Sequence, residues 1–186
     1  VIMGDLPGQG QTSRAQKGQI DDFNTYHENI LEWIKIANEY KIPTFVLGVG
    51  LGGLIILNLL EKTELPIEGI LLFSPMLELK RDYKGRKNKL ISNVGKISKD
   101  TRFKVGITPQ DLTRNDEIIE ETANDGLMLK KVTYSWYNLI NEKMKETMDH
   151  IRDIKPISAL IMYGTNDKIL ETQSINEMKD KLKSKA

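Results

Sequence analysis

The chain contains no cysteine, which excludes disulfide bonds, thiolate catalysis and cysteine-ligated zinc sites. Its formal net charge is only +1, so composition gives no reason to expect a nucleic-acid partner. Long hydrophobic runs are missing as well. The longest, residues 51–60, is interrupted by Asn58 and is far shorter than the roughly 18 residues that span a membrane. Because no signal peptide is recognisable either, we expect a cytoplasmic protein.

The two ends of the chain have an unusual pattern. Residues 1–4 are apolar and predict a strand, which the segment 5–10, rich in glycine and proline, brings to an end. The chain thus opens inside a predicted strand without an initiator methionine, and it closes on a helical pattern. We therefore expect a chain that is truncated at both ends. Its 186 residues suit one domain with a substantial core.

Buried strands and helices alternate along much of the sequence. Three apolar runs predict buried strands, at 44–48, 68–74 and 158–164. A helix that Asp21 or Asp22 can cap precedes the first strand, and an almost wholly apolar helix follows that strand at 51–60. This alternation predicts an α/β fold, in which a parallel sheet is flanked by helices.

A long polar segment interrupts this alternation. The sequence between Pro75 and Pro156 is helical and loop-like, and it is too long for a simple connection between two strands. We interpret it as an inserted cap. The predicted organisation is a core at 1–75, a helical cap at 76–154, and the continuation of the core at 155–186.

A glycine-rich turn at 48–53 joins a predicted strand to the apolar helix. Gly48, Gly50 and Gly53 satisfy the dinucleotide-binding pattern G-x-G-x-x-G, while Gly48 and Gly52 satisfy the outer positions of the nucleophile elbow G-x-S-x-G. A dinucleotide site needs an acidic residue at the end of the next strand, but that strand ends at Phe73 and Ser74. The elbow interpretation is therefore favoured. A dinucleotide loop and a simple tight turn remain the alternatives.

Four segments in order resemble one family, the α/β-hydrolases of the lysophospholipase, monoacylglycerol lipase and serine aminopeptidase type. Residues 5–14, DLPGQGQTSR, resemble its D-x-x-G-H-G-x-S segment, and residues 47–53, LGVGLGG, resemble its L-G-H-S-M-G-G elbow. Residues 73–75, FSP, resemble the segment before its cap. Residues 161–169, IMYGTNDKI, resemble its L-x-x-x-G-x-x-D-x-x-V segment. Shorter segments of the predicted cap, at 113–115 and 134–137, are similar to bacterial lysophospholipases.

The resemblance implies the positions of the catalytic residues, and it also implies that some of these residues are replaced or absent. Gly50 stands where the family has its nucleophilic serine, the backbone amide of Leu51 would help to hold the oxyanion, and Asp167 corresponds to the triad acid. The family's H-G segment and its late triad histidine have no counterpart in this chain. The resemblance thus implies a carboxylic ester hydrolase fold that is inactive as given. A non-catalytic protein that binds acylated ligands or lipids is the alternative.

The two histidines do not replace the missing base. His27 and His150 both precede Asp167, whereas the triad histidine of this fold follows the acid, and we expect each to be a partly exposed helical residue. They also lie too far apart in sequence to suggest a metal site. We expect neither a metal nor a cofactor.

The first part of the predicted cap is basic. Residues 77–104 contain ten lysines and arginines against three acidic residues, and Leu90, Ile91, Val94 and Ile97 give the stretch an apolar side. Such a segment could rest on an anionic membrane surface, although a solvated lid surface is the simpler interpretation. The expected ligand is a small acyl ester or a lysophospholipid, and the protein is expected to be cytoplasmic or peripheral at the membrane.

Overall fold

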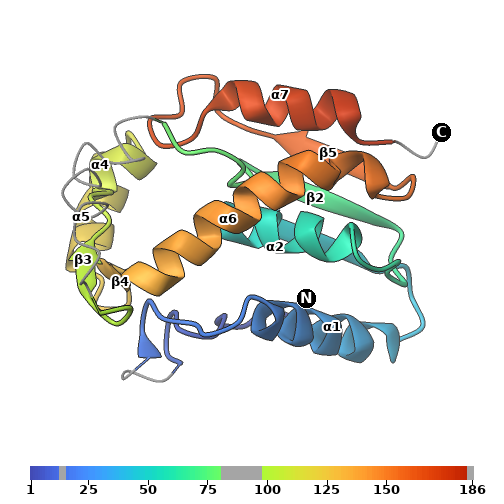
Figure 1. Ribbon diagram of the computed structural model, residues 1–186, viewed down its shortest axis with the longest axis horizontal. Coiled ribbons are helices and arrows are strands. Elements are labelled where there is room, and N and C mark those ends of the chain that lie inside the picture. The colour runs from blue at the N-terminus through green and yellow to red at the C-terminus, as the bar shows by residue number, and fades with distance from the viewer. Residues whose placement is uncertain (13–15, 81–97, 184–186) are drawn as a thin grey trace.

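The computed structural model describes residues 1–12, 16–80 and 98–183 of the chain (Figure 1). Its centre is a three-stranded parallel sheet with strand order β1-β2-β5. The bounds of these strands are Phe45–Val49 for β1, Gly69–Phe73 for β2 and Ser158–Met162 for β5. All three apolar runs predicted as strands are therefore strands, and the sheet is parallel as expected.

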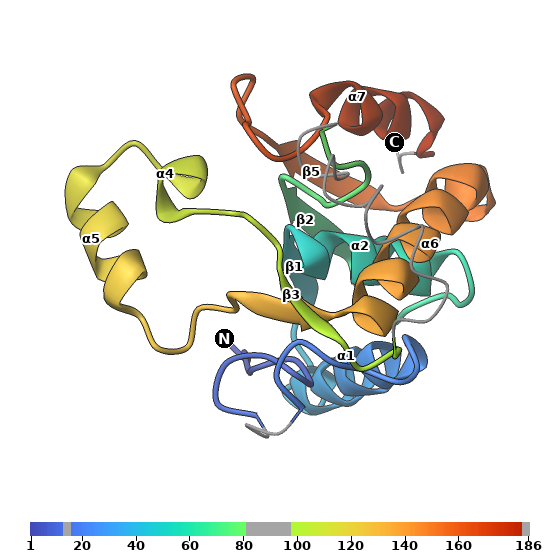
Figure 2. The ribbon, with the colours of Figure 1, turned by 60° about the vertical axis from the view of Figure 1, so that its left-hand side comes forward.

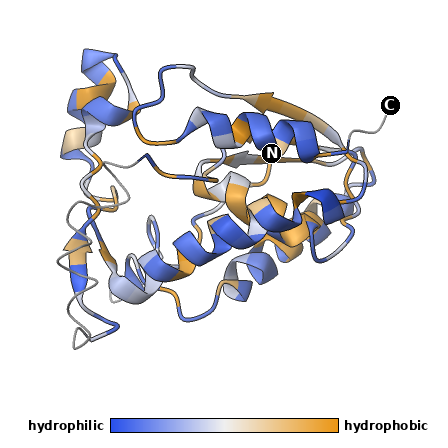
Figure 3. Ribbon diagram, turned by 45° about the horizontal axis from the view of Figure 1, so that its top comes forward, coloured by the Kyte–Doolittle hydropathy of each residue, from blue (hydrophilic) through white to orange (hydrophobic). Residues whose placement is uncertain are grey.

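Helices pack on one side of this sheet. The apolar α2 (Leu51–Leu60) lies against β1, and both α1 (Asn24–Asn38) and α6 (Tyr134–His150) pack against α2 (Figure 2). This position explains why α2 is apolar all round, because eight of its ten residues are buried. Figure 3 shows the contrast with the outer helices, which mix hydrophilic and hydrophobic residues along their length.

A buried polar contact joins two of these helices. Asn58 of α2 is fully buried, and its Nδ2 donates a hydrogen bond to Oγ1 of Thr147 on α6 at 3.0 Å. The charged residues Glu146 and Lys143 lie at the margin of the same contact and form an ion pair with each other. Because a buried amide that lacks a partner is costly, this pairing fixes how α6 lies on α2.

The chain beyond β2 builds a separate small layer. The strands β3 (Arg102–Lys104) and β4 (Lys131–Thr133) pair antiparallel, and the helices α4 (Pro109–Leu112) and α5 (Asp116–Asn124) lie between them in sequence (Figure 2). This layer falls within the predicted cap. The same predicted segment also contains α6, which packs on the core helix α2, and the short helix η2 (Ile151–Asp153).

The first helix begins differently from the prediction. Phe23, and not an aspartate, is the residue at the N-cap position of α1, and it makes no side-chain cap. Asp22 instead accepts a hydrogen bond from the backbone nitrogen of Asn24 at 2.9 Å. The ring of Phe23 is buried and packs edge-on against Tyr26 and His27, so burial of an aromatic side chain sets this boundary.

Two predictions about the N-terminal half are wrong. Residues 1–4 form no strand, because among the described residues none lies beside them to provide a ladder, and Val1 and Met3 are exposed. His27 is buried at 5% exposure, where a partly exposed side chain was expected. It lies on the face of α1 that also buries Tyr26 and Ile30. Most of the predicted basic stretch, residues 81–97, lies outside the described residues.

One face of the central sheet is open. Phe45, Leu47 and Val49 of β1 point to this face and are 56–62% exposed, and they are in register with Leu160 and Met162 of β5, which are 51% and 41% exposed. Parallel sheets are normally covered on both faces. Among the described elements, none covers these side chains, so the chain presents a row of apolar residues to solvent.

The final helix, α7 (Thr172–Lys181), buries Ser174, Ile175 and Met178. Within the described ranges, no helix has both the length and the apolar character needed to cross a membrane.

Candidate active site

The turn between β1 and α2 has an unusual backbone. Gly50 is the single residue between Val49 and Leu51, with φ 53° and ψ −115°. Side chains other than glycine rarely adopt this conformation, and the cost is about 1–3 kcal/mol where they do. Two backbone hydrogen bonds hold the turn: the Gly50 nitrogen donates to Phe73 oxygen at 3.0 Å, and Met76 nitrogen donates to Gly50 oxygen at 2.9 Å.

Different structural constraints act on the glycines of this turn. A Cβ added to Gly48 would lie 2.6 Å from Ile56 Cδ1 and 2.7 Å from the Gly53 nitrogen, and one added to Gly53 would lie 2.8 Å from Pro75 Cβ. A Cβ at Gly50 or at Gly52 would meet nothing within 4 Å. The close approach that the elbow pattern assigns to Gly52 is therefore made by Gly53. At Gly50, by contrast, only the backbone conformation requires glycine.

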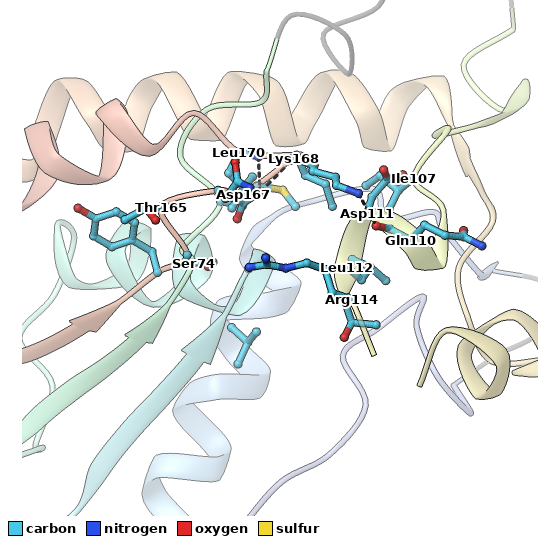
Figure 4. A pocket seen from close by; sticks show the side chains of 18 residues that line it. Ser74, Ile107, Gln110, Asp111, Leu112, Arg114, Thr165, Asp167, Lys168 and Leu170 are labelled. Carbon is cyan, nitrogen blue, oxygen red and sulfur yellow. Dashed lines mark hydrogen bonds between the residues drawn. The ribbon is translucent and has the colours of Figure 1, made fainter. Parts of the chain in front are cut away.

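The free space at Gly50 opens into a cleft. The cleft has a volume of about 760 Å³ and lies where β1, β2 and β5 end, with the α4–α5 layer as its outer wall (Figure 4). It is lined by Val49, Gly50, Ser74, Met76, Ile107, Gln110, Asp111, Leu112, Thr113, Arg114 and residues 163–170. A side chain at position 50 would point into this space, which is the arrangement of a nucleophile elbow.

Asp167 lines the same cleft. It follows β5 on a loop, and its Oδ1 accepts hydrogen bonds from the backbone nitrogens of Ile169 at 2.8 Å and Leu170 at 2.9 Å. Lys80 donates to its backbone oxygen. The aspartate thus caps its own loop, while Oδ2 forms no hydrogen bond or ion pair with the described residues. The structure brings Gly50 and Asp167 together, and their roles in chemistry stay predictions.

Ser74 is a further strained residue in the cleft. It comes directly after β2, has φ 42°, and its nitrogen donates to Met162 oxygen at 2.8 Å. A positive φ in a residue other than glycine is uncommon and occurs often at functional sites. The sequence pattern drew attention to this segment only through its likeness to the family.

The amide that would hold an oxyanion is available. Leu51 is the first residue of α2, and its nitrogen makes no hydrogen bond within the part of the chain that the structure describes. The first amides of a helix have no partner inside the helix and favour negative charge. The first turn of α2 therefore has the polarity that suits an oxyanion, and the oxyanion role of Leu51 stays a prediction.

No imidazole reaches the cleft. His27 is buried between helices, where burial lowers its pKa to about 4, helped by the nearby charges of Lys62 and Lys143. His150 is exposed as expected, and its Nδ1 lies 2.8 Å from Asp153 Oδ2, a contact that raises its pKa. Neither histidine lines the cleft. The chain therefore places no general base of this kind beside Gly50.

The wall of the cleft contains Thr113 and Arg114, from a segment noted in the sequence only for its similarity to bacterial lysophospholipases, and also residues 110–112, for which the sequence suggested no role. Residues 110–114 come from the end of α4 and the connection to α5, and Lys168 Nζ ties this layer to the core by donating to Gln110 oxygen at 2.9 Å. Only folding brings this segment to the strand ends, some fifty residues away in sequence. Among the described residues, no cluster of three or more acidic or histidine side chains is arranged to hold a metal ion.

Comparison with known proteins agrees with this geometry. The whole chain, residues 1–186, matches the family model described as "Serine aminopeptidase, S33". The Bacillus subtilis (strain 168) protein named Phospholipase YtpA is 31% identical over 172 residues, which are 92% of this chain and 66% of that protein. The chain thus spans just under two thirds of the length of this curated relative.

Solved structures show the same fold. The monoacylglycerol lipase of Paleococcus ferrophilus has a TM-score of 0.76 and 22% identity, over 97% of this chain and 68% of that one. A soluble variant of monoglyceride lipase from Saccharomyces cerevisiae, in complex with a substrate analog, has a TM-score of 0.82 and 20% identity, over 97% of this chain and 64% of that one. These likenesses show the fold of the chain, and the interpretation of residues 48–53 as an elbow stays a prediction.

Proposed function

Because this chain belongs to the α/β-hydrolase family described as "Serine aminopeptidase, S33", we propose that its cleft binds a fatty acyl ester such as a monoacylglycerol or a lysophospholipid. The observation that carries the proposal is Gly50. Its backbone has the strained conformation of a strand-to-helix elbow, and its free side opens into a cleft that Asp167 also lines. The names of the relatives, a phospholipase and two monoacylglycerol lipases, support the choice of ligand.

The lining of the cleft suits such a ligand. Ile107, Leu112, Met76 and Leu170 supply apolar surface, and Leu112 is 54% exposed to the cleft and to solvent. An acyl chain gains about 0.8 kcal/mol for each methylene group that leaves water. On this proposal the Leu51 amide holds the ester carbonyl oxygen, because it makes no hydrogen bond with the described residues and lies at the positive end of α2.

We propose that the chain as it stands binds the ester without cleaving it. Ester hydrolysis in this family's manner needs a hydroxyl that attacks the carbonyl carbon and a base that takes its proton. Gly50 has no hydroxyl, and neither histidine lines the cleft. The protein then acts as an acyl-ligand binder rather than as a lipase.

Binding is tested with a fluorescent monoacylglycerol and one cleft variant. Leu112→Glu places a charge in the apolar lining and should weaken binding by about tenfold or more. Leu127→Glu is the matched control, since Leu127 is also an exposed leucine of the same layer but does not line the cleft. No saturable binding by the unchanged chain, or equal losses in both variants, would refute the proposal.

Hydrolysis is tested with a fluorogenic ester. We expect background rates from the unchanged chain and from Gly50→Ser, because a new serine has no base to accept its proton and triad residues act as a unit. Robust turnover by the unchanged chain would show that other groups in the cleft do the chemistry. Turnover that appears only in Gly50→Ser would show that the elbow works with a base other than histidine.

A further inference from the structure

The charged groups of the cleft are not equivalent. Two carboxylates line it, Asp111 and Asp167, and both already accept hydrogen bonds. Asp111 Oδ2 accepts from the Thr108 nitrogen at 2.8 Å and from Thr108 Oγ1 at 2.7 Å, and Asp167 Oδ1 accepts from two backbone amides. Asp111 therefore caps the start of α4, and Asp167 caps its own loop.

The two cations that line the cleft, Lys168 and Arg114, form fewer hydrogen bonds with the described residues than the carboxylates do. Lys168 donates one hydrogen bond, to the backbone oxygen of Gln110. Arg114 forms no hydrogen bond or ion pair with the residues that the structure describes. Its guanidinium has five donors in a planar fork, which suits phosphate and carboxylate groups.

The direction of Arg114 gives these donors a place to act. The residue lies on the connection between α4 and α5, and Figure 4 shows its side chain extending from this wall across the cleft towards Ser74 at the end of β2. An exposed arginine usually turns its head group outwards into bulk water. Here it extends instead over the cleft, whose lining also includes the apolar side chains of Ile107, Leu112 and Leu170.

We infer that Arg114 selects an anionic head group, so that the cleft takes a phosphate-bearing acyl ester in preference to a neutral monoacylglycerol. The inference rests on the proposed function, because it names the class of ester that the cleft binds. The acyl chain lies along the apolar lining, and the phosphate oxygens accept two hydrogen bonds from the Arg114 fork. Lys168, on the same cleft, adds positive charge near the phosphate.

The test compares ligands that share one acyl chain. Dodecanoyl lysophosphatidic acid, dodecanoyl monoacylglycerol and glycerol phosphate are titrated, below micelle-forming concentrations, into the unchanged chain and into Arg114→Gln. The phosphate lipid should bind the unchanged chain about tenfold or more tightly than the neutral lipid. Arg114→Gln should remove this preference and leave the affinity for the monoacylglycerol within about twofold.

Two further variants make the result specific. Arg152→Gln removes the same charge from η2, away from the cleft, and should leave all three affinities unchanged. Arg114→Lys keeps the charge but loses the fork, so it should retain only part of the preference.

Each contrary outcome has a distinct meaning. Equal affinity for both lipids, unaffected by Arg114→Gln, overturns the inference and leaves the proposed function standing. Tight binding of glycerol phosphate alone overturns it in favour of a soluble phosphate ligand. The absence of binding by either lipid overturns the proposed function together with the inference.

Discussion

The strained turn at Gly50 leads to a stability prediction in which three similar substitutions have different outcomes. Gly48, Gly50 and Gly52 lie within five residues of each other, and each can be changed to alanine. The substitution adds the same methyl group every time. Only the backbone conformation and the surrounding space differ, so the differences between the variants report on the turn itself.

At Gly50 the conformation decides the outcome. The added methyl group meets no atom within 4 Å, so no clash arises. The φ of 53° with ψ of −115° remains, and it costs alanine about 1–3 kcal/mol. Part of this cost is offset because alanine also restricts the unfolded chain, and the net loss of stability is about 1–2 kcal/mol. In a chain of this length the expected fall in Tm is about 3–6 °C.

At the other two glycines the surroundings decide the outcome. Gly52 lies inside α2 with open space beside it, so Gly52→Ala should stabilise the chain by about 0.5–1 kcal/mol through helix propensity. At Gly48 the methyl group would press on the Gly53 nitrogen at 2.7 Å and the Gly52 carbonyl carbon at 2.8 Å. Backbone atoms cannot move aside, so Gly48→Ala should cost the most, about 2–3 kcal/mol.

Urea denaturation followed by circular dichroism measures the series. The expected order of stability is Gly52→Ala, the unchanged chain, Gly50→Ala and then Gly48→Ala, with similar m-values throughout. A Gly50→Ala variant as stable as the Gly52→Ala variant would refute the reasoning, because it would show that position 50 is not held at positive φ. Gly50→Ser should match Gly50→Ala, since the penalty comes from the backbone.

Two further predictions concern the buried histidine and the open sheet face. His27 has a folded pKa of about 4, below its unfolded value of 6.5, so the unfolded chain binds the proton more tightly and stability is lost as pH falls from 6.5 to 4. His27→Leu should remove this loss, which is at most about 3 kcal/mol. In urea titrations, the stability of the variant minus that of the unchanged chain should therefore increase as pH is lowered from 8 to 4.5. A difference that stays constant with pH would contradict the assigned pKa. Leu47→Lys places a charge in the exposed apolar row of the sheet and should reduce binding of a hydrophobic dye, whereas Thr63→Lys, a change in the loop after α2, should leave dye binding unchanged. Unchanged dye binding in Leu47→Lys would show that the row is not exposed in solution.

Glu61 changes stability with pH in the opposite sense to His27, so the effect of His27 is visible only as a difference between two variants. Burial, and then the neighbouring Glu146, raise the pKa of Glu61 to about 7. A carboxyl with a raised folded pKa contributes stability at low pH, which is lost as pH rises through about 7. Over pH 4.5 to 6.5 the two groups offset each other in the unchanged chain, and only removal of one reveals the other.

Much of the core follows from local pattern. The apolar runs that became β1, β2 and β5, and the apolar helix that became α2, could be predicted because a segment buried on all sides must be apolar along its whole length. The order of motifs placed Gly50 and Asp167 at the ends of two such strands. Since parallel strands end at one edge of a sheet, their meeting in one cleft could be expected from the sequence as well.

Prediction from local pattern failed where the pairing or burial of a residue depends on residues that are distant in sequence. Residues 1–4 have the composition of a strand, but a strand exists only when another pairs with it, and no described segment does so. His27 lies beside polar residues in sequence, yet the packing of α1 against α2 buries it. Phe45, Leu47 and Val49 show the opposite error. Their apolar sequence predicts burial, but their side chains are exposed in the folded chain.

The sequence by itself determined the fold class, the family and the turn at Gly50, because each depends on residues that are close together in the chain. Only the tertiary structure decided which groups face the cleft. Arg114 and Gly50 are separated by more than sixty residues, and no local pattern relates them. They line one cleft because the α4–α5 layer lies beside the strand ends, where Lys168 donates a hydrogen bond to it. A binding site combines long-range contacts, so its chemistry is complete only once the chain has folded.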